Sequence, residues 1–179
     1  AERRTVEDTA SYFDDLARDW DERVQPQIAE RVAEWCRSLS LRPRSVVLDV
    51  GCGTGLSSLA CSEQLDKNGM VIALDRSRSM IEEGRRRRDR PGIRWVRADA
   101  ARVPVASRAV DVVIAMHLWP HLHSPAQTLR EWRRVLKRRG HLLIVHLVPR
   151  DEVNRRHREV DGAVGRDVLP PAAELAEVV

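Results

Sequence analysis

The sequence predicts an α/β fold with a doubly wound parallel sheet, and three observations support this prediction. Five short runs are apolar without alternation, as expected for strands that helices cover on both faces. Helical stretches separate most of these runs, and this order favours right-handed crossovers between parallel strands. A turn with three glycines directly follows the first run. The runs lie at residues 46–50, 70–74, 93–96, 110–116 and 142–148.

The segment before the first strand is expected to form a helical lid over residues 1–42. A helix over residues 5–20 would be capped by Thr5, with acidic residues in its first turn. Pro26 suits the first turn of a second helix, whose apolar residues repeat at spacings of three and four. Residues 43–179 would then form the α/β domain.

Three helices are expected between the strands. In the clearest one, over residues 124–139, Ser124 is the cap, Pro125 takes the first position and Gln127 completes a capping box. Gly140 lies where a helix-ending glycine belongs. The other two helices cover residues 56–65 and 77–88, whereas residues 99–109 are expected to be irregular.

Composition narrows the class of protein. The 179 residues suit one domain, and 42% hydrophobic with 32% charged residues is typical of a globular chain. No apolar run approaches the roughly 20 residues that span a bilayer, and the start of the chain lacks the pattern of a signal peptide. The three cysteines form no Cys-x-x-Cys pair. We therefore expect a soluble, cytoplasmic protein with reduced thiols and no membrane contact.

The net charge of +4 is not read as a sign of nucleic-acid binding. Lysine occurs only at positions 67 and 137, so nearly all of the 31 basic residues are arginines spread along the chain. One Tyr and one Phe leave few aromatic rings for stacking on bases. The arginine run at 85–88 is interpreted as a solvated helix end, where cations suit the helix dipole.

The strongest motif is the turn that follows the first strand. Gly51, Gly53 and Gly55 alternate there with other residues, which allows a tight turn and a close approach of a ligand to the backbone. Ligands of open α/β sheets bind at the carboxyl ends of the strands. This context indicates a binding site rather than a purely structural turn.

Two carboxylates follow the next two strands. Asp75 ends the second strand, where an acidic residue can accept hydrogen bonds from both hydroxyls of a ribose. Asp99 follows the third strand and could accept a hydrogen bond from the exocyclic amine of adenine. The alternatives are that Asp75 only starts a helix and that Asp99 only caps a loop.

These residues resemble the motifs of a known family. Residues 47–55 resemble motif I of the class I S-adenosylmethionine-dependent methyltransferases, which have a Rossmann-like fold, and Asp75 and Asp99 resemble the second and third motifs. Residues 12–20 are similar to the N-terminal lid of small-molecule methyltransferases of the quinone-biosynthesis type. The resemblance covers about residues 11–148.

The resemblance implies S-adenosylmethionine as the cofactor and methyl transfer to a small-molecule acceptor. The protein would mainly align the acceptor, the methyl carbon and the sulfur for an in-line displacement, and such positioning can contribute up to about 7–11 kcal/mol. The residues expected at the cofactor are Asp49, Gly51, Cys52, Gly53, Asp75, Arg76, Asp99, Ala100 and Met116.

A base is needed only if the acceptor must lose a proton. The candidates are His117, His121, His123 and His146, and we favour His121 because it leaves the fourth strand at the mouth of the expected cleft. The alternative is that these histidines are structural. A metal site is not expected, because no Cys or carboxylate completes a ligand set in this cluster.

The lid also contributes candidates. Tyr12 and Trp20 are aromatic residues that could pack over the donor or the substrate. The alternative is that both rings only pack the helices of the lid.

Three other functions are alternatives to methyl transfer to a small molecule. A non-catalytic S-adenosylmethionine-binding module would have the same motifs. A nicotinamide-dependent oxidoreductase would need a third glycine where Leu56 stands. Amino-methylating nucleic-acid enzymes tend to carry Asn/Asp-Pro-Pro-Tyr/Trp after the fourth strand, and residues 115–120 lack it.

The end of the sequence departs from the family. A helix from residue 151, a Pro170-Pro171 break and a helix over 172–179 are expected, but the usual C-terminal antiparallel strand pair is missing. A bare fifth strand would expose unpaired backbone groups. We therefore expect either a C-terminally truncated chain or a cover over this edge, supplied by residues 150–179 or by another chain in a homo-oligomer.

Overall fold

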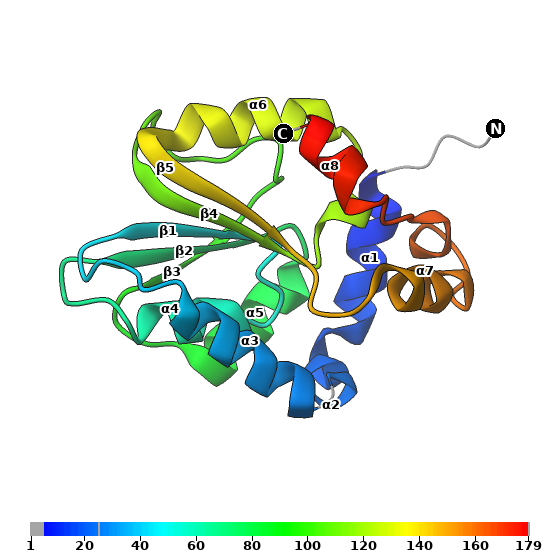
Figure 1. Cartoon of the computed structure of the whole chain (residues 1–179). Coiled ribbons are helices and arrows are strands. Elements are labelled where there is room, and N and C mark those ends of the chain that lie inside the picture. Colours follow the sequence, from blue (N-terminus) through cyan, green and yellow to red (C-terminus); the bar gives the residue numbers. More distant parts are fainter. Residues whose placement is uncertain (1–5, 25, 179) are drawn as a thin grey trace.

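Five parallel strands form the centre of the fold, in the order β3-β2-β1-β4-β5 (Figure 1). This computed structural model describes residues 6–24 and 26–178. The predicted doubly wound parallel sheet is confirmed. The strands are β1 (Val46–Val50), β2 (Met70–Asp75), β3 (Ile93–Arg97), β4 (Val110–Met116) and β5 (Leu136–Val145).

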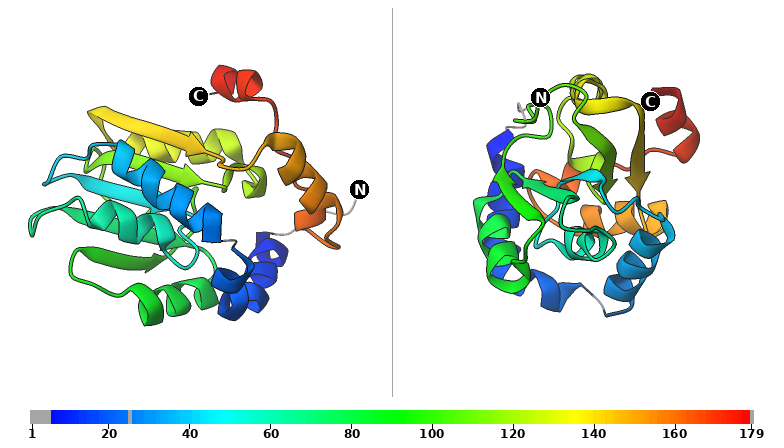
Figure 2. Two further views of the ribbon diagram at one scale, coloured as in Figure 1. Left: turned by 60° about the horizontal axis from the view of Figure 1, so that its bottom comes forward. Right: turned by 90° about the vertical axis from the view of Figure 1, so that its left-hand side faces the viewer.

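Helices cover both faces of the sheet, with α3, α4 and α5 on one side and α6 on the other (Figure 2). Residues 99–109 contain no helix or strand, as predicted. The helical elements are α1 (Val6–Leu16), η1 (Ala17–Asp19), α2 (Trp20–Arg23), α3 (Pro26–Ser38), α4 (Leu56–Ser62), α5 (Arg78–Arg88), η2 (Trp119–His121), α6 (Pro125–Val135), α7 (Arg150–Arg158), η3 (Val164–Arg166) and α8 (Ala172–Val178).

Alternate side chains of the strands divide the core into two clusters. Val47 and Val71 join the cluster on the side of α3 and α4, whereas Leu48 and Val50 pack with Trp132 of α6. This division follows from the period of two along a strand. Because both faces are buried, the strands are apolar without alternation, which is the pattern that predicted them.

The N-terminal helices differ from the predicted lid in two ways. The expected helix over 5–20 is broken into α1, η1 and α2, and the expected cap Thr5 lies outside the described residues. The second helix, α3, packs against α4 and buries Val32 and Cys36 in the core. None of the described helices is long and apolar enough to cross a membrane.

The sequence predicts a helix over 124–139 and a strand over 142–148, and the predicted boundary between them is wrong. Helix α6 ends at Val135, where the backbone amide of Ala109 donates to the Val135 carbonyl, and β5 begins at once. Gly140 therefore lies inside β5 and does not end the helix. Its place has another reason, since a Cβ there would lie 2.8 Å from Leu136 Cδ2 and 3.0 Å from the Asp111 carbonyl. Ser124 takes the cap position, but its side chain makes no capping hydrogen bond.

The fifth strand pairs with β4, and no other strand of the described chain pairs with its outer edge. The C-terminal segment covers part of this region instead. Leu169 and Leu175 belong to a small apolar cluster with Ile144 and Val148. Residues 150–175 therefore pack against the carboxyl end of β5, and the predicted cover over the whole outer edge of this strand stays a prediction.

Candidate functional site

A cavity of about 640 Å³ lies at the carboxyl ends of β1, β2 and β4. Strand order reverses between β1 and β4, and open α/β sheets bind ligands at such a switch point. The N-terminal helices and α7 close over the same end of the sheet (Figure 1). The predicted site residues that line the cavity are Gly51, Cys52, Gly53, Asp75, Arg76, Asp99, Ala100 and Met116, together with all four candidate bases, His117, His121, His123 and His146.

The glycine turn is fixed by backbone hydrogen bonds to the neighbouring strand. The amides of Gly51 and Cys52 both donate to the Leu74 carbonyl, at 2.8 and 3.0 Å. Gly53 has a φ of +55°, and the nearest atom to a Cβ placed there would be 3.8 Å away, on Trp20. The turn therefore leaves space above its backbone for a ligand.

Asp75 ties the turn to the start of α5. Its Oδ2 accepts from the Gly53 amide at 2.8 Å and its Oδ1 accepts from the Ser77 amide at 2.8 Å. Burial raises the pKa of Asp75, although these backbone hydrogen bonds oppose the shift. A carboxylate has about four acceptor positions, so this one can still accept hydrogen bonds from hydroxyls in the cavity.

Asp99 and Arg76 lie together beside Asp75. Asp99 Oδ1 accepts from the Ala101 amide at 2.8 Å, and its Oδ2 lies 3.9 Å from Arg76 Nη1. The carbonyl of Ala100 is held by Trp132 Nε1 at 3.1 Å. This network fixes the loop after β3, where the sequence predicted recognition of adenine.

Asp49 differs from the other predicted cofactor residues, because it does not line the cavity. Its Oδ2 accepts from the hydroxyls of Ser57 and Ser58, at 2.7 and 2.5 Å. Burial raises the pKa of Asp49 to about 6. Its other oxygen is buried without a partner in the described part of the chain. The structure thus places Asp49 under the turn, where it joins β1 to α4.

Two aspartates anchor the N-terminal helices over the cavity. Asp14 of α1 accepts from the Ser77 hydroxyl at 2.5 Å and from the Ser79 amide at 2.9 Å, at the start of α5. Partial burial opposes the shift, but these hydrogen bonds hold the pKa of Asp14 below its ordinary value. Asp21 of α2 accepts from Thr54 Oγ1 at 2.6 Å.

The arginine run at 85–88 is only partly the solvated helix end that the sequence predicted. Arg88 is 12% exposed, and its Nη2 donates to Asp21 Oδ2 at 2.6 Å. Arg87 Nη2 donates to the Arg18 carbonyl at 2.7 Å. These two arginines fasten the N-terminal helices, whereas Arg85 and Arg86 are exposed. Sequence spacing gave no signal for contacts across more than 60 residues.

On the opposite side of the cavity, His121 is paired with a carboxylate. Its Nδ1 lies 2.5 Å from Oδ2 of Asp167, which follows η3 near the end of the chain. The side chain of His121 is 12% exposed and that of Asp167 is fully buried. The Asp167 carbonyl in turn contacts His157 Nδ1 at 2.8 Å. Asp167 and His157 were not predicted from the sequence, because they lie 46 and 36 positions from His121 in segments without a motif.

His117 and His146 form a second histidine pair, with ring centroids 5.3 Å apart. Burial lowers the pKa of His117 to about 4 and that of His146 to about 3. Both rings are therefore neutral near pH 7. The described residues contain no group of three or more His, Cys, Asp or Glu side chains that could hold a metal.

The aromatic residues of the N-terminal helices divide differently from the prediction. Trp20 lines the cavity, but Tyr12 does not and instead packs edge-on against Phe13, with centroids 5.3 Å apart. Phe13 lines the cavity and contacts His121 edge-on at 5.2 Å. Phe13 is thus the aromatic residue of α1 that contacts His121 at the cavity.

Comparisons with known proteins agree with this geometry. Residues 48–144 match a family model described as "Methyltransferase domain". The chain is 32% identical over 142 residues to a demethylmenaquinone methyltransferase of Renibacterium salmoninarum, covering 77% of this chain and 58% of that protein. It is 31% identical over 140 residues to an uncharacterized 37.1 kDa protein of transposon TN4556 from Streptomyces fradiae, covering 78% of this chain and 39% of that protein.

A solved structure shows the same fold. A SAM-dependent methyltransferase from Aquifex aeolicus superposes with a TM-score of 0.72 at 18% identity, covering 90% of this chain and 85% of that one. The chain spans 39% and 58% of the length of the two curated relatives above.

Proposed function

We propose that this chain, which belongs to the class I S-adenosylmethionine-dependent methyltransferase family, transfers a methyl group to a small-molecule acceptor. One observation carries the proposal. The Gly53 amide and the Asp75 carboxylate are joined at the open end of the sheet, beside a turn with space for a ligand.

The residues present fit S-adenosylmethionine. Gly51 and Gly53 would hold its methionine part, Asp75 would accept from its ribose hydroxyls, and Asp99 would accept from its adenine amine. When bound, this donor supplies a methyl group already activated by the sulfonium. The protein therefore has to position the acceptor and exclude water, which α1 and α2 would do as a lid anchored by Asp14 and Asp21. Asp49, although outside the cavity, would fix the position of the glycine turn through its hydrogen bonds to Ser57 and Ser58.

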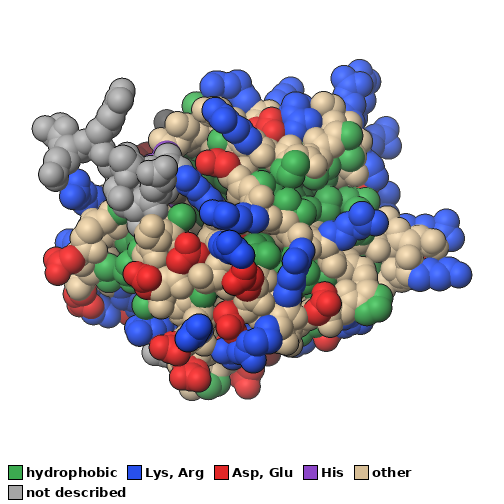
Figure 3. Space-filling view, turned by 180° about the vertical axis from the view of Figure 1, so that it is seen from behind, with side chains coloured by type: hydrophobic (Ala, Val, Ile, Leu, Met, Phe, Trp, Pro, Cys, Tyr) green, Lys and Arg blue, Asp and Glu red, His purple; other side chains and the backbone are tan. Residues whose placement is uncertain are grey.

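The nature of the acceptor and the partners are also proposals. A cavity of about 640 Å³ is of the size that holds a small molecule, which favours a small-molecule acceptor over a nucleic acid. Figure 3 shows acidic and basic side chains mixed over the lower half of this face, whereas basic side chains prevail over its upper and right-hand parts. The free outer edge of β5 favours a homo-oligomer in which a second copy covers this edge. Three free cysteines without a disulfide favour a cytoplasmic location.

Two measurements test the proposal. At a hundredfold excess over Kd, S-adenosylhomocysteine should raise the free energy of unfolding by about 2.7 kcal/mol, whereas NADPH should not. Methyl-labelled S-adenosylmethionine incubated with acceptor pools should give a product heavier by one methyl group. Binding without any transfer would instead indicate a non-catalytic module, and a shift with NADPH alone would reject the family's cofactor.

A further inference from the structure

His121 and Asp167 form a paired imidazole and carboxylate at the wall of the cavity, away from the proposed donor residues. The carboxylate is buried and can only accept, so the short contact requires the proton of the neutral ring to lie on Nδ1. That tautomer leaves a lone pair on Nε2. No hydrogen bond within the described residues occupies Nε2.

Two separate segments, α1 and α7, hold this pair in place. Phe13 of α1 packs edge-on against the His121 ring, with centroids 5.2 Å apart. His157 of α7 contacts the same ring at 5.1 Å and also the Asp167 carbonyl. The C-terminal segment therefore builds part of the cavity wall, and it fixes an imidazole that still faces the cavity.

We propose that His121 is the base that accepts a proton from the acceptor and that Asp167 is the residue that positions it, so that the acceptor is a neutral hydroxyl compound. This inference rests on the proposed methyl transfer. The acceptor hydroxyl gives its proton to Nε2 of His121 while its oxygen bonds to the methyl carbon. The carbon–sulfur bond breaks with its electron pair left on sulfur, and the imidazolium later returns the proton to water.

The charges around the cavity favour a hydroxyl over an ammonium acceptor. Among the described lining residues, the carboxylates are Asp75 and Asp99, both on the donor side. The titratable groups near His121 are Asp167, His117, His146 and His157, and His123 lines the same cavity. Arg156, which pairs with Glu152, acts on His117. A cationic amine would find no free carboxylate on this side of the cavity.

The test uses 4-nitrophenol, whose anion absorbs visible light and whose neutral form does not. The probe is added to protein saturated with S-adenosylhomocysteine, at a pH where the free probe is mostly neutral. The parent should show the anion band on binding. His121→Gln and Asp167→Asn should reduce the bound anion at least tenfold, and should slow methylation of a hydroxyl acceptor by roughly 10²–10⁴-fold.

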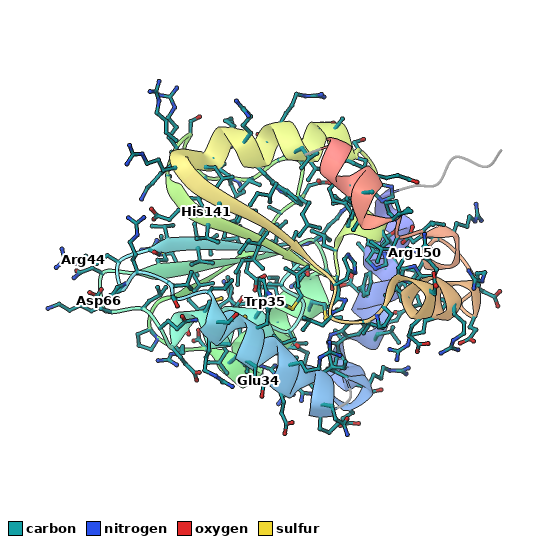
Figure 4. All side chains as sticks on the ribbon, in the orientation of Figure 1. Glu34, Trp35, Arg44, Asp66, His141 and Arg150 are labelled. Carbon is teal, nitrogen blue, oxygen red and sulfur yellow. The ribbon has the colours of Figure 1, made fainter. Side chains whose placement is uncertain are left out.

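Matched controls separate the base from a structural role. Asp161→Asn changes an exposed aspartate of the same C-terminal segment, and His141→Gln changes an exposed histidine on β5, towards the opposite end of the sheet from α7 (Figure 4). Both should keep the anion band. Thermal unfolding checks each variant, and His121→Gln decides the matter if Asp167→Asn does not fold.

The outcomes distinguish this inference from the proposed function. If calorimetry shows no binding of S-adenosylhomocysteine to the parent, the proposed function fails and this inference fails with it. If that ligand binds but the anion band is absent, or is equal in His121→Gln, only the inference is overturned.

Discussion

The two walls of the cavity are built by different means. The wall proposed to hold the donor depends on backbone groups. The amide of Gly51 donates to the Leu74 carbonyl and that of Gly53 to the Asp75 carboxylate, between residues about 20 positions apart. The opposite wall is made of side chains from segments far apart, with Phe13, His121 and Asp167 meeting in space. The spacing of residues along the chain determines the local backbone geometry of the first wall. The side chains of the second wall can be exchanged without changing that backbone geometry.

This difference predicts which changes damage the fold and which alter the chemistry. In the glycine turn, Gly55 should tolerate no added atoms, whereas Gly53 has space for a ligand. The side-chain wall should respond mainly to charge and protonation.

The largest effect is expected at Gly55, which ends the glycine turn. Gly55 has a φ of +88°, and a Cβ there would lie 2.3 Å from the Trp95 ring. Gly55→Ala should lower the free energy of unfolding by about 2–5 kcal/mol, through strain and overpacking together. Gly92→Ala is the control, since Gly92 has a φ of +95° and nothing within 4 Å, and should cost about 1–2 kcal/mol. Equal losses in urea titrations would show that close packing does not define this wall.

The next effect concerns the carboxylate that completes the same wall. Asp75→Ala should weaken S-adenosylhomocysteine binding by roughly 1.5–3 kcal/mol, because a charged acceptor of two ribose hydroxyls is lost. The control Asp66→Ala removes an exposed carboxylate that pairs with Arg44 at the end of the sheet opposite α7 (Figure 4). Unchanged affinity of the Asp75 variant by calorimetry would remove Asp75 from the donor site.

The side-chain wall should make the free energy of unfolding depend on pH through His146. The folded-state pKa of His146 is lowered by burial to about 3 from an ordinary 6.5, so its stabilising effect is complete above about pH 6.5 and lost as the pH falls below it. The parent should lose up to about 1.4 kcal/mol of unfolding free energy per pH unit more than His146→Gln in that range. His141→Gln, at an exposed site, should follow the parent. Parallel curves for the parent and His146→Gln would mean that this ring is not buried.

The smallest effect is expected at the lid. Asp21→Ala removes the partner of Thr54 and Arg88 and should cost about 1 kcal/mol, with faster amide exchange in α1 and α2. Glu82→Ala breaks an exposed pair with Arg78 that solvent screens, and should leave the free energy of unfolding nearly unchanged. Unchanged exchange in the lid of the Asp21 variant would contradict the anchoring role.

The same contrast explains how far the sequence could predict the molecule. The strands, the glycine turn and the positions of Asp75 and Asp99 follow from period and spacing, which are local properties. The sequence predicts the wrong end for α6, because Gly140 matches a helix-ending glycine but instead lies close to the backbone carbonyls of Asp111 and Lys137.

The acceptor wall shows the limit of local reasoning. His121 could be singled out because it follows a strand, but its partner Asp167 lies in a segment with no periodic pattern. Arg88 looked solvated because its partner Asp21 is 67 positions away. Only the fold brings such residues together. The fold also shows that Phe13 lines the cavity, whereas the sequence predicted Tyr12 there.

The central claim is that the turn at Gly51 and Gly53, with Asp75, binds the donor of a methyltransferase. Isothermal titration of the parent protein with S-adenosylhomocysteine, and in parallel with NADPH, tests it most directly. We expect a one-to-one isotherm with S-adenosylhomocysteine and no heat of binding with NADPH. Saturable binding of NADPH with no response to S-adenosylhomocysteine would contradict it.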